Sequence, residues 1–293
     1  MREDVPSRTA AWVAAARQLG MLLPDDVRLI DDPYGAAFSS PALAWMIAGR
    51  TLRQLASVPG LRSWILYIQV RTRVIDDALR AFVAGGGKQL VLLGAGYDCR
   101  ALRIPELADV TVFEVDHPAT QIHKRAVLAR SGILSPSHYV TWDFEARPME
   151  DLPDVLIESG LDTVAPVFSI WEGVTMYLSE PAIDASLRAI RAWSGPGSQL
   201  AMTYFAKARI EQPSLATRAM KALVARVGEP YRFGWTPGEL PAYLAERGFS
   251  LTKDLAIADA ARALLPADLA AHVGNPVRRF VTSAAAESIA VAT

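Results

Sequence analysis

Cysteine is almost absent from this 293-residue sequence, which contains only Cys99. A single cysteine excludes a disulfide within the chain and a cysteine-rich metal site. Since disulfides belong to oxidising compartments, their absence indicates a reducing one. We therefore expect a cytoplasmic protein that binds no metal.

An excess of charge of either sign is also missing. Lysine and arginine number 30 against 31 aspartates and glutamates, and no run of like charge occurs. Proteins that bind nucleic acid usually carry a basic surface that neutralises phosphates. We therefore expect no nucleic-acid partner.

Long apolar runs are absent too, although 51% of the residues are apolar. Charge or glycine interrupts each run well before the roughly 20 residues that a membrane-spanning helix needs. Residues 1–6 carry acids and a proline, where a secretory signal has a basic start and an apolar centre. The sequence predicts a soluble chain with no membrane partner and with one large core.

The most informative segment is an apolar run that ends in two glycines. Residues 89–93 have no polar face, as in a parallel strand covered by helices on both sides. Gly94 and Gly96 follow, and their lack of a Cβ lets the backbone turn and a ligand approach. A helix starting near Cys99 would direct its first NH groups at that ligand. The pattern indicates a nucleotide-binding turn.

A second apolar segment, residues 110–116, ends in Asp116. In nucleotide-binding folds the second strand usually ends in an acid that binds the ribose hydroxyls, roughly 20 residues beyond the glycines. Asp116 lies at that separation. The alternative is an ordinary α/β turn with a solvated acid.

The nucleotide class depends on a glycine that is missing. Dinucleotide-binding turns place a third glycine three residues after the second, where this chain has Cys99. This departure disfavours NAD and FAD and leaves S-adenosylmethionine (SAM) as the expected cofactor.

Strands and helices alternate through the rest of the chain, which predicts an α/β fold with a doubly wound, seven-stranded sheet of the class I methyltransferase type. We expect one structural domain, in which residues 1–84 are a helical cap region and residues 85–293 are the core. A lid insertion is predicted at about residues 206–235. The further strands are predicted at residues 138–144, 166–171, 199–205, 249–255 and 277–283.

Four more charged positions are candidates for the cofactor site. In the predicted helix 61–84, Arg71 or Arg73 could bind the SAM carboxylate, although both could also lie on a solvated face. Asp143 and Phe144 end the third strand and could hold the adenine, or Asp143 could cap the next loop. Glu172 follows the fourth strand and should lie over the same crevice.

Three motifs resemble the leucine carboxyl methyltransferase superfamily: residues 93–100 (LGAGYDCR), 113–118 (FEVDHP) and 171–178 (WEGVTMYL). The similarity extends from about Ser7 to the last strand. It is strongest to the bacterial branch of polyketide O-methyltransferases that resemble the tetracenomycin carboxyl methylase. The family usually has threonine at the position of Cys99.

The resemblance implies SAM-dependent methyl transfer and assigns a role to each candidate. Arg71 would hold the SAM carboxylate, with Arg73 as the alternative. Gly94 and Gly96 would lie beside the amino-acid tail, and Asp116 would bind the ribose. The remaining implied cofactor residues are Asp143 and Phe144 at the adenine and Glu172 near the methionine ammonium.

The methyl acceptor is less determined by the sequence. A carboxylate is ionised at pH 7 and needs no base, whereas a phenol would benefit from one, and no convincing base is visible. Tyr177 and Tyr204 are the candidate substrate contacts. A small, polyketide-like metabolite is the expected acceptor. A protein C-terminal carboxylate, a SAM-binding module without catalysis and an NAD enzyme that tolerates Cys99 remain alternatives.

Overall fold

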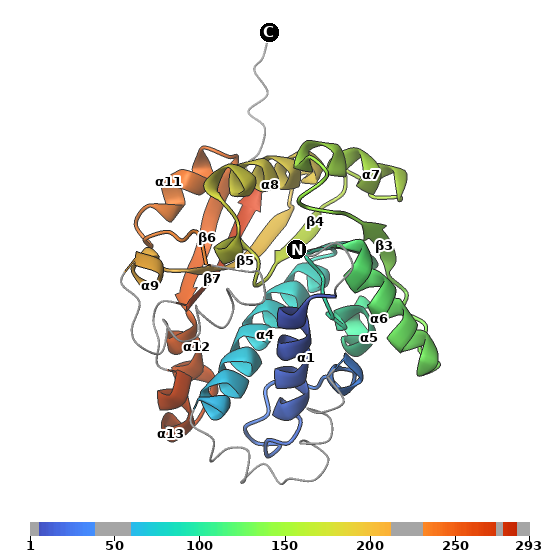
Figure 1. The fold of residues 1–293 in the computed structure, drawn as a ribbon. Helices are drawn as coiled ribbons and strands as arrows, with labels where there is room; N and C mark the ends of the chain where they lie inside the picture. Colours follow the sequence, from blue (N-terminus) through green and yellow to red (C-terminus); the bar gives the residue numbers. More distant parts are fainter. Residues whose placement is uncertain (1–5, 39–59, 212–230, 274–277, 286–293) are drawn as a thin grey trace.

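The computed structural model describes residues 6–38, 60–211, 231–273 and 278–285. Within these residues seven strands form one sheet in the order β3-β2-β1-β4-β5-β7-β6, in which β7 runs antiparallel to its neighbours. This order confirms the predicted doubly wound, seven-stranded sheet (Figure 1). The strands are β1 Gln89–Leu93, β2 Thr111–Asp116, β3 His138–Thr141, β4 Val167–Trp171, β5 Gln199–Phe205, β6 Phe249–Ala256 and β7 Arg278–Ala285.

The strand order reverses beside β1. The chain passes from β1 to β2 and β3 on one side and then returns to β4 on the other side. Leu92 pairs with Glu114 of β2 and with Ile170 of β4, so the carboxyl ends of the three strands lie at one edge. Ligands of open α/β sheets bind at such a reversal. The fold therefore places the candidate site outside the ends of β1, β2 and β4.

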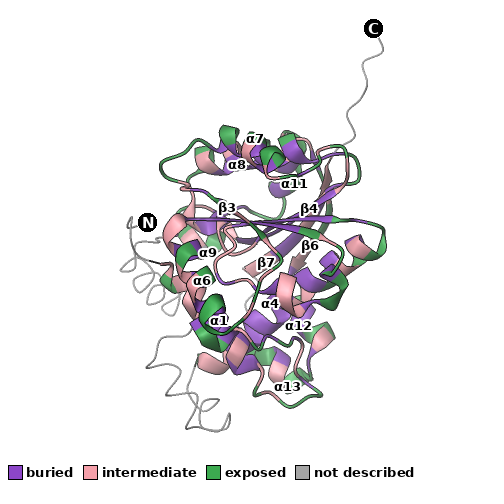
Figure 2. Cartoon of the chain, turned by 90° about the vertical axis from the view of Figure 1, so that its right-hand side faces the viewer, coloured by how far each residue is buried: buried purple, intermediate pink, exposed green. Residues whose placement is uncertain are grey.

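Helices cover both faces of the sheet in three layers, which Figure 2 shows. One face carries α7 (Leu152–Glu158), α8 (Glu180–Trp193) and α11 (Leu240–Ala245). The other carries α1 (Arg8–Gly20), α4 (Leu61–Ala84), α6 (Pro118–Arg130), α12 (Ile257–Leu264) and α13 (Ala267–Ala270). The short elements are α5 Arg100–Arg103, α9 Lys207–Glu211, η1 Gly35–Phe38, η2 Pro105–Leu107, η3 Met149–Asp151, η4 Thr175–Tyr177 and η5 Ala271–Val273.

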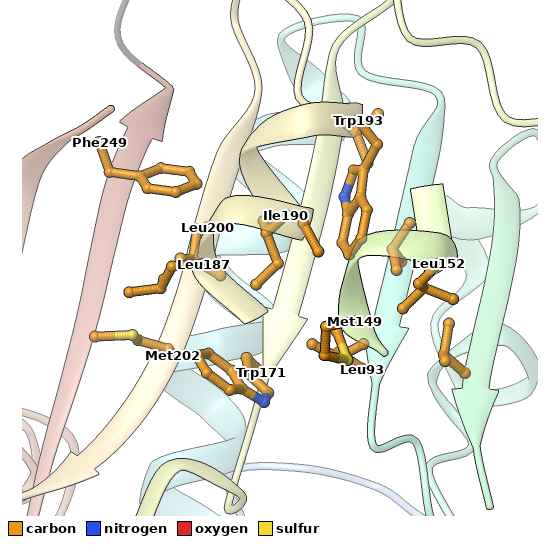
Figure 3. Close-up of a cluster of buried hydrophobic side chains, with 14 of the residues drawn as sticks. Leu93, Met149, Leu152, Trp171, Leu187, Ile190, Trp193, Leu200, Met202 and Phe249 are labelled. Carbon is orange, nitrogen blue, oxygen red and sulfur yellow. The ribbon is translucent and has the colours of Figure 1, made fainter. Parts of the chain in front are cut away.

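Strand β1 is apolar throughout because it has a core on each side. Val91 and Leu93 belong to the cluster beneath α7 and α8, which Figure 3 shows with Leu93 near Met149 and Trp171. Leu90 and Leu92 belong to the cluster beneath α4 and α12. All five residues of the strand are buried. The alternation of side chains along a strand divides one apolar run between two cores.

Serine side chains begin two of the helices. The hydroxyl oxygen of Ser7 accepts a hydrogen bond from the Ala10 NH at 3.2 Å at the start of α1. Ser179 caps α8 in the same way through the Ala182 NH, with a proline in the first turn. In both helices the side-chain oxygen satisfies an amide that has no partner within the helix.

Helix α4, which belongs to the predicted helical cap region, packs directly on the sheet. Its residues Ile75 and Leu79 are fully buried against the sheet cluster that contains Leu90 and Phe168. With α1 packed on its outer side, α4 is one layer of the main sandwich. Residues that precede β1 in the sequence therefore help to build the core itself.

Between β6 and β7 the chain forms two separate helices, α12 and α13, because Pro266 lacks the amide that a continuous helix requires. Two predictions need comment. The third strand ends at Thr141. Most of the predicted lid, residues 212–230, lies outside the described residues.

None of the helices that the structure describes combines the length and the apolar character needed to cross a membrane. Over the same ranges, histidine, cysteine, aspartate and glutamate side chains form no group of three or more that could hold a metal ion.

Candidate functional site

A cavity of about 560 Å³ lies at the carboxyl ends of β1, β2 and β4. Helices α1 and α4 line one side of it, and the segment after β4 lines another. Its volume is in the range of small-molecule sites. Eight of the nine residues predicted for the site line this cavity: Arg71, Gly94, Gly96, Asp116, Asp143, Phe144, Glu172 and Tyr177.

The two glycines allow close approach of neighbouring segments to the turn after β1. Gly94 has φ 70° and Gly96 has φ 53°, a region that other residues rarely adopt. A Cβ on Gly94 would lie 2.8 Å from Val174 Cγ2, and one on Gly96 would lie 3.0 Å from Ala10 Cβ. The turn is therefore packed between α1 and the segment after β4, with no room for side chains.

Asp116 joins the glycine turn to the second strand. Its Oδ2 accepts a hydrogen bond from the Gly96 NH at 2.5 Å, and its Oδ1 accepts one from the His117 NH at 2.6 Å. Burial raises the pKa of this carboxyl to about 6, although the two backbone hydrogen bonds act in the opposite direction. Asp116 therefore lies in the cavity as an acid that titrates close to neutral pH.

Arg71 of α4 and Glu172, which follows β4, form an ion pair in the wall of the cavity. Arg71 Nε lies 2.7 Å from Glu172 Oε1, and both side chains are largely buried. Burial alone would raise the pKa of Glu172, but the charges of Arg71 and Arg100 lower it below its usual value. Arg71 Nε and Glu172 Oε1 are therefore partners in a buried ion pair. Both residues line the cavity.

Arg100 is the centre of a buried ionic network beneath this pair. Its Nε donates to Asp76 Oδ1 at 2.7 Å, its Nη2 donates to Glu172 Oε2 at 2.9 Å, and its Nη1 donates to Asp98. Arg103 donates to both oxygens of Asp76, at 2.6 and 2.9 Å. Since buried charges are stable only when paired, this network fixes Glu172 relative to α4.

Two further buried cations hold the backbone of the glycine turn. Arg17 of α1 pairs with Asp32 at 2.6 Å and donates to the carbonyl of Tyr97 at 2.6 Å. Lys124 of α6 pairs with Glu114 of β2 and donates to the carbonyl of Asp98. The turn is thus attached to α1, to α6 and to β2 before any ligand binds.

The structure distinguishes the two candidate arginines of α4, Arg71 and Arg73. Arg71 lines the cavity, whereas Arg73 pairs with Asp77 on the outer face at 2.8 Å and donates to the Leu29 carbonyl. Arg73 thus lies on the solvated helix face that was the alternative prediction for both arginines. Its i,i+4 pairing with Asp77 is the local ion pair expected for an exposed helix face.

Asp143 caps the loop after β3, which is one of the two roles that the sequence left open. Its Oδ1 accepts hydrogen bonds from the Glu145 NH at 2.9 Å and the Ala146 NH at 3.3 Å, and so it caps the loop after β3. The hydrogen bond from Glu145 is the main cause that lowers its pKa. Asp143 also lines the cavity, as does Phe144.

Tyr204 does not reach the cavity, which corrects its predicted contact with the substrate. Its hydroxyl donates to Asp254 Oδ2 at 3.0 Å in a buried group that includes Arg279. Burial and the charge of Asp254 raise the pKa of Tyr204. Side chains alternate along β5, so the next residue, Phe205, lines the cavity in its place. Tyr177 does line the cavity, in η4.

Several lining residues were not identified from the sequence. They include the cation Arg278 of β7 and aromatic residues from segments far apart in the chain. A helical spacing of aromatic residues indicates a buried face but does not show whether that face meets a core or a cavity. These aromatic residues are Trp12, Trp64, Tyr67, Phe205 and Tyr231.

Comparisons with known proteins relate the chain to one family. The family model for leucine carboxyl methyltransferase matches residues 10–191. A protein of Mycobacteroides abscessus, named for an inferred SAM-dependent methyltransferase activity, is 37% identical over 197 residues, which cover 66% of this chain and 62% of that protein. Similarly named proteins are 33% identical in Streptomyces coelicolor, with coverage of 70% and 71%, and in Parafrankia, with coverage of 82% and 74%. The chain thus spans less than two thirds of the Mycobacteroides relative.

Two solved structures share the fold. A candidate methyltransferase from Thermobifida fusca has a TM-score of 0.56 at 20% identity, with 92% of this chain and 97% of that chain covered. A DUF574 family protein from Streptomyces avermitilis has a TM-score of 0.57 at 16% identity, with 92% and 96% covered. Both confirm the class I methyltransferase fold predicted from the order of strands and helices.

The packing of the glycine turn predicts that Gly94→Ala destabilises the protein more than Gly132→Ala. Gly94 and Gly132 have φ values of 70° and 68°, so the cost of a left-handed conformation, about 1–2 kcal/mol, is common to both. Only the Cβ at residue 94 would meet a side chain, Val174, and relieving that contact should add about 1 kcal/mol or more. Urea denaturation of the two variants measures the difference. Equal losses of stability would show that Val174 moves aside without cost.

Proposed function

The chain belongs to the leucine carboxyl methyltransferase family, and we propose that it transfers the methyl group of SAM to an oxygen atom of a small metabolite. The proposal is carried by one observation: the glycine turn, Asp116 and the pair of Arg71 and Glu172 line one cavity at the strand reversal. A carboxylate acceptor is favoured over a hydroxyl by the family's name. A polyketide-like metabolite is the class that the sequence motifs suggest.

The cavity offers partners for each part of the cofactor. Arg71 would hold the carboxylate of the methionine tail through its planar guanidinium, and Glu172 would lie near the ammonium. Gly94 and Gly96 both line the cavity and would lie beside this tail. Asp116 would accept hydrogen bonds from the ribose hydroxyls.

The adenine end is formed by the loop after β3. Phe144 is half-buried and packs against the core cluster beneath α8, which gives a ring a fixed apolar surface. Asp143 would accept a hydrogen bond from the adenine amino group. Its position is set by the loop hydrogen bonds from Glu145 and Ala146, so no reorganisation would be needed on binding.

For this reaction the protein mainly has to position the acceptor and exclude water. SAM supplies an electrophilic methyl group that an oxygen nucleophile attacks in line. Residues of this chain would hold the acceptor at roughly 3–3.5 Å from that group and exclude water, which is a large part of the catalytic effect. Tyr177, on the wall of the cavity, is the proposed acceptor contact. An ionised carboxylate would need no base.

Methyl transfer from labelled SAM to a panel of small acids and phenols tests the reaction. With saturating SAM and a carboxylate acceptor, we expect a rate that is nearly constant from about pH 6 to 9, because the nucleophile is already ionised. A tenfold rise between about pH 6 and 8 with the best acceptor would favour a hydroxyl. Transfer only to a protein C-terminus would indicate a protein methyltransferase. Binding of SAM without methyl transfer to any acceptor would indicate a SAM-binding module without catalysis.

The ionic network predicts that Arg100→Lys weakens binding of S-adenosylhomocysteine (SAH), whereas Arg103→Lys does not. Both substitutions keep the charge and remove a guanidinium that binds Asp76, but only Arg100 also positions Glu172. We expect the dissociation constant to rise about tenfold for Arg100→Lys, equivalent to about 1.4 kcal/mol.

Calorimetry at 25 °C measures both variants, after circular dichroism has shown that they are folded. Arg103→Lys serves as the matched control because it disturbs the same buried acid. A similar loss of affinity in the two variants would assign the effect to general destabilisation and would contradict a specific role of Arg100 in SAH binding.

The titration of Asp116 predicts a loss of SAH affinity at acid pH. With a pKa of about 6 in the free protein, Asp116 is ionised at pH 7 and about nine-tenths protonated at pH 5. Only the ionised carboxylate accepts from both ribose hydroxyls, so affinity should fall about tenfold over this interval. The pKa values of Asp143 and Glu172 are lowered, and these acids remain ionised there.

The measurement is SAH calorimetry at pH 5, 6 and 7. Asp116→Asn should bind weakly at every pH and lose the dependence. His117→Gln keeps Asp116 and removes the neighbouring imidazole, so the SAH affinity of this variant should still fall between pH 7 and pH 5. A dependence that survives in Asp116→Asn would mean that another group titrates.

A further inference from the structure

The segment that follows β4, residues 172–178, connects the two ligand sites proposed above. Glu172 pairs with Arg71 among the cofactor residues, with 2.7 Å between Oε1 and Nε. Tyr177 packs on Tyr231 in the aromatic part of the cavity, with 5.7 Å between the ring centroids. The aromatic part is the lining formed by Trp12, Trp64, Tyr67, Phe205 and Tyr231. The position of this one segment therefore decides how cofactor and acceptor lie relative to each other.

The segment leaves the sheet at the end of β4. Trp171, the last residue of β4, pairs with Met202, whereas β5 continues to Phe205. Gly173 then turns the chain, with a φ of 74° that other residues rarely adopt. Since the pairing of β4 with β5 stops at Trp171, the amides that follow must find partners outside the ladder.

Thr203, the residue after Met202, binds the segment at two points. Its Oγ1 accepts a hydrogen bond from the Gly173 NH at 2.8 Å, and its carbonyl oxygen accepts one from Thr175 Oγ1 at 2.8 Å. Thr203 is 2% exposed and Thr175 is 1% exposed, so water has little access to either bond. The χ1 angle of a β-branched side chain is restricted, which gives the Thr203 hydroxyl a defined position.

Gly173 transmits this position to the ion pair of the cofactor site. A Cβ on Gly173 would lie 3.7 Å from Arg71 Nη1, so the guanidinium lies next to this glycine. Glu172 is the preceding residue in the chain. The Arg100 network fixes the carboxylate of Glu172, whereas Thr203 fixes the backbone that carries it. Thr203 itself does not line the cavity, so it acts on a ligand only through this segment.

We propose that Thr203 is a positioning residue of the cofactor site, whose hydroxyl sets the place of Glu172 and Arg71 through the Gly173 amide. This inference rests on the proposed function. Valine at this position would keep the shape of threonine but would place a methyl group where the Gly173 NH now has its acceptor. An amide that loses its acceptor away from water is unfavourable, so the turn would move. Binding groups displaced from a fixed geometry lose affinity.

Binding of SAH to variants of Thr203, measured by calorimetry at neutral pH, tests the proposal. In Thr203→Val the dissociation constant should rise about tenfold, because the Gly173 NH is left without its acceptor. In Thr203→Ser the hydroxyl remains, and the dissociation constant should stay within about threefold of the wild-type value.

Ser169→Ala is the matched control, because it also removes a buried hydroxyl next to the same part of the sheet. Ser169 lies on β4, and its Oγ accepts a hydrogen bond from Trp193 Nε1 of α8 at 3.0 Å. Its loss should destabilise the protein without moving the segment after β4. The SAH affinity of Ser169→Ala should therefore stay within about twofold of the wild-type value.

Hydrogen exchange of the Gly173 amide, followed by NMR, measures the bond itself. The amide should be protected in the wild-type protein and in Thr203→Ser and should exchange faster in Thr203→Val. Unchanged SAH affinity in Thr203→Val, an equal loss in Thr203→Ser or Ser169→Ala, or rapid exchange of this amide in the wild-type protein would overturn the role of Thr203. Failure of the wild-type protein to bind SAH would instead contradict the proposed function.

Discussion

The site depends on a buried guanidinium between three carboxylates. Arg100 contacts Asp76 of α4, Asp98 of the glycine turn and Glu172 after β4, so it joins three segments that are distant in the sequence. Removing one partner from a buried ion pair typically costs about 3–5 kcal/mol, because the other charge is left uncompensated. The network therefore tolerates little relative movement. This rigidity is what lets Arg71 and Glu172 keep a fixed separation without a ligand.

That rigidity explains why the ligand-free cavity already has the form of a binding site. Binding loses affinity when groups must be ordered or moved, and a prearranged site avoids that cost. Asp116 shows the balance involved. Its two backbone hydrogen bonds favour the ionised form, yet burial still raises the pKa of its carboxyl to about 6. Burial destabilises the ionised carboxylate, and further hydrogen bonds from ribose hydroxyls would stabilise it.

The sequence predicted the fold well because the fold is built from local signals. The apolar run at residues 89–93, the glycines after it and the serine caps each specify their own element, and the alternation of elements then determines the sheet. The cofactor half of the cavity was predictable for the same reason. Asp116 and Glu172 follow strands whose carboxyl ends must meet at one edge.

The predictions that failed depend on which way a side chain points. Tyr204 and Phe205 are adjacent at the end of β5, and no local pattern showed which of them faces the cavity. The pairing of β5 with β7 decides it, and β7 lies more than 70 residues later, at Arg278–Ala285. The packing of helix α4 on the sheet was also not predictable from the sequence. Its apolar face is evident, but only the sheet beneath it shows that this face belongs to the core.

This difference explains why the cofactor is easier to infer than the acceptor. Four of the proposed cofactor residues, Gly94, Gly96, Asp116 and Glu172, lie in the three motifs. The Arg100 network joins the first and third motifs through Asp98 and Glu172, so these two motifs constrain each other. The aromatic part of the cavity is assembled from α1, α4, η4 and the ends of β5 and β7, which share no motif. Substitutions there would leave the ionic network intact, so the acceptor can change while the cofactor site stays the same. We therefore expect the lining of this aromatic part, and not the family motifs, to determine the acceptor.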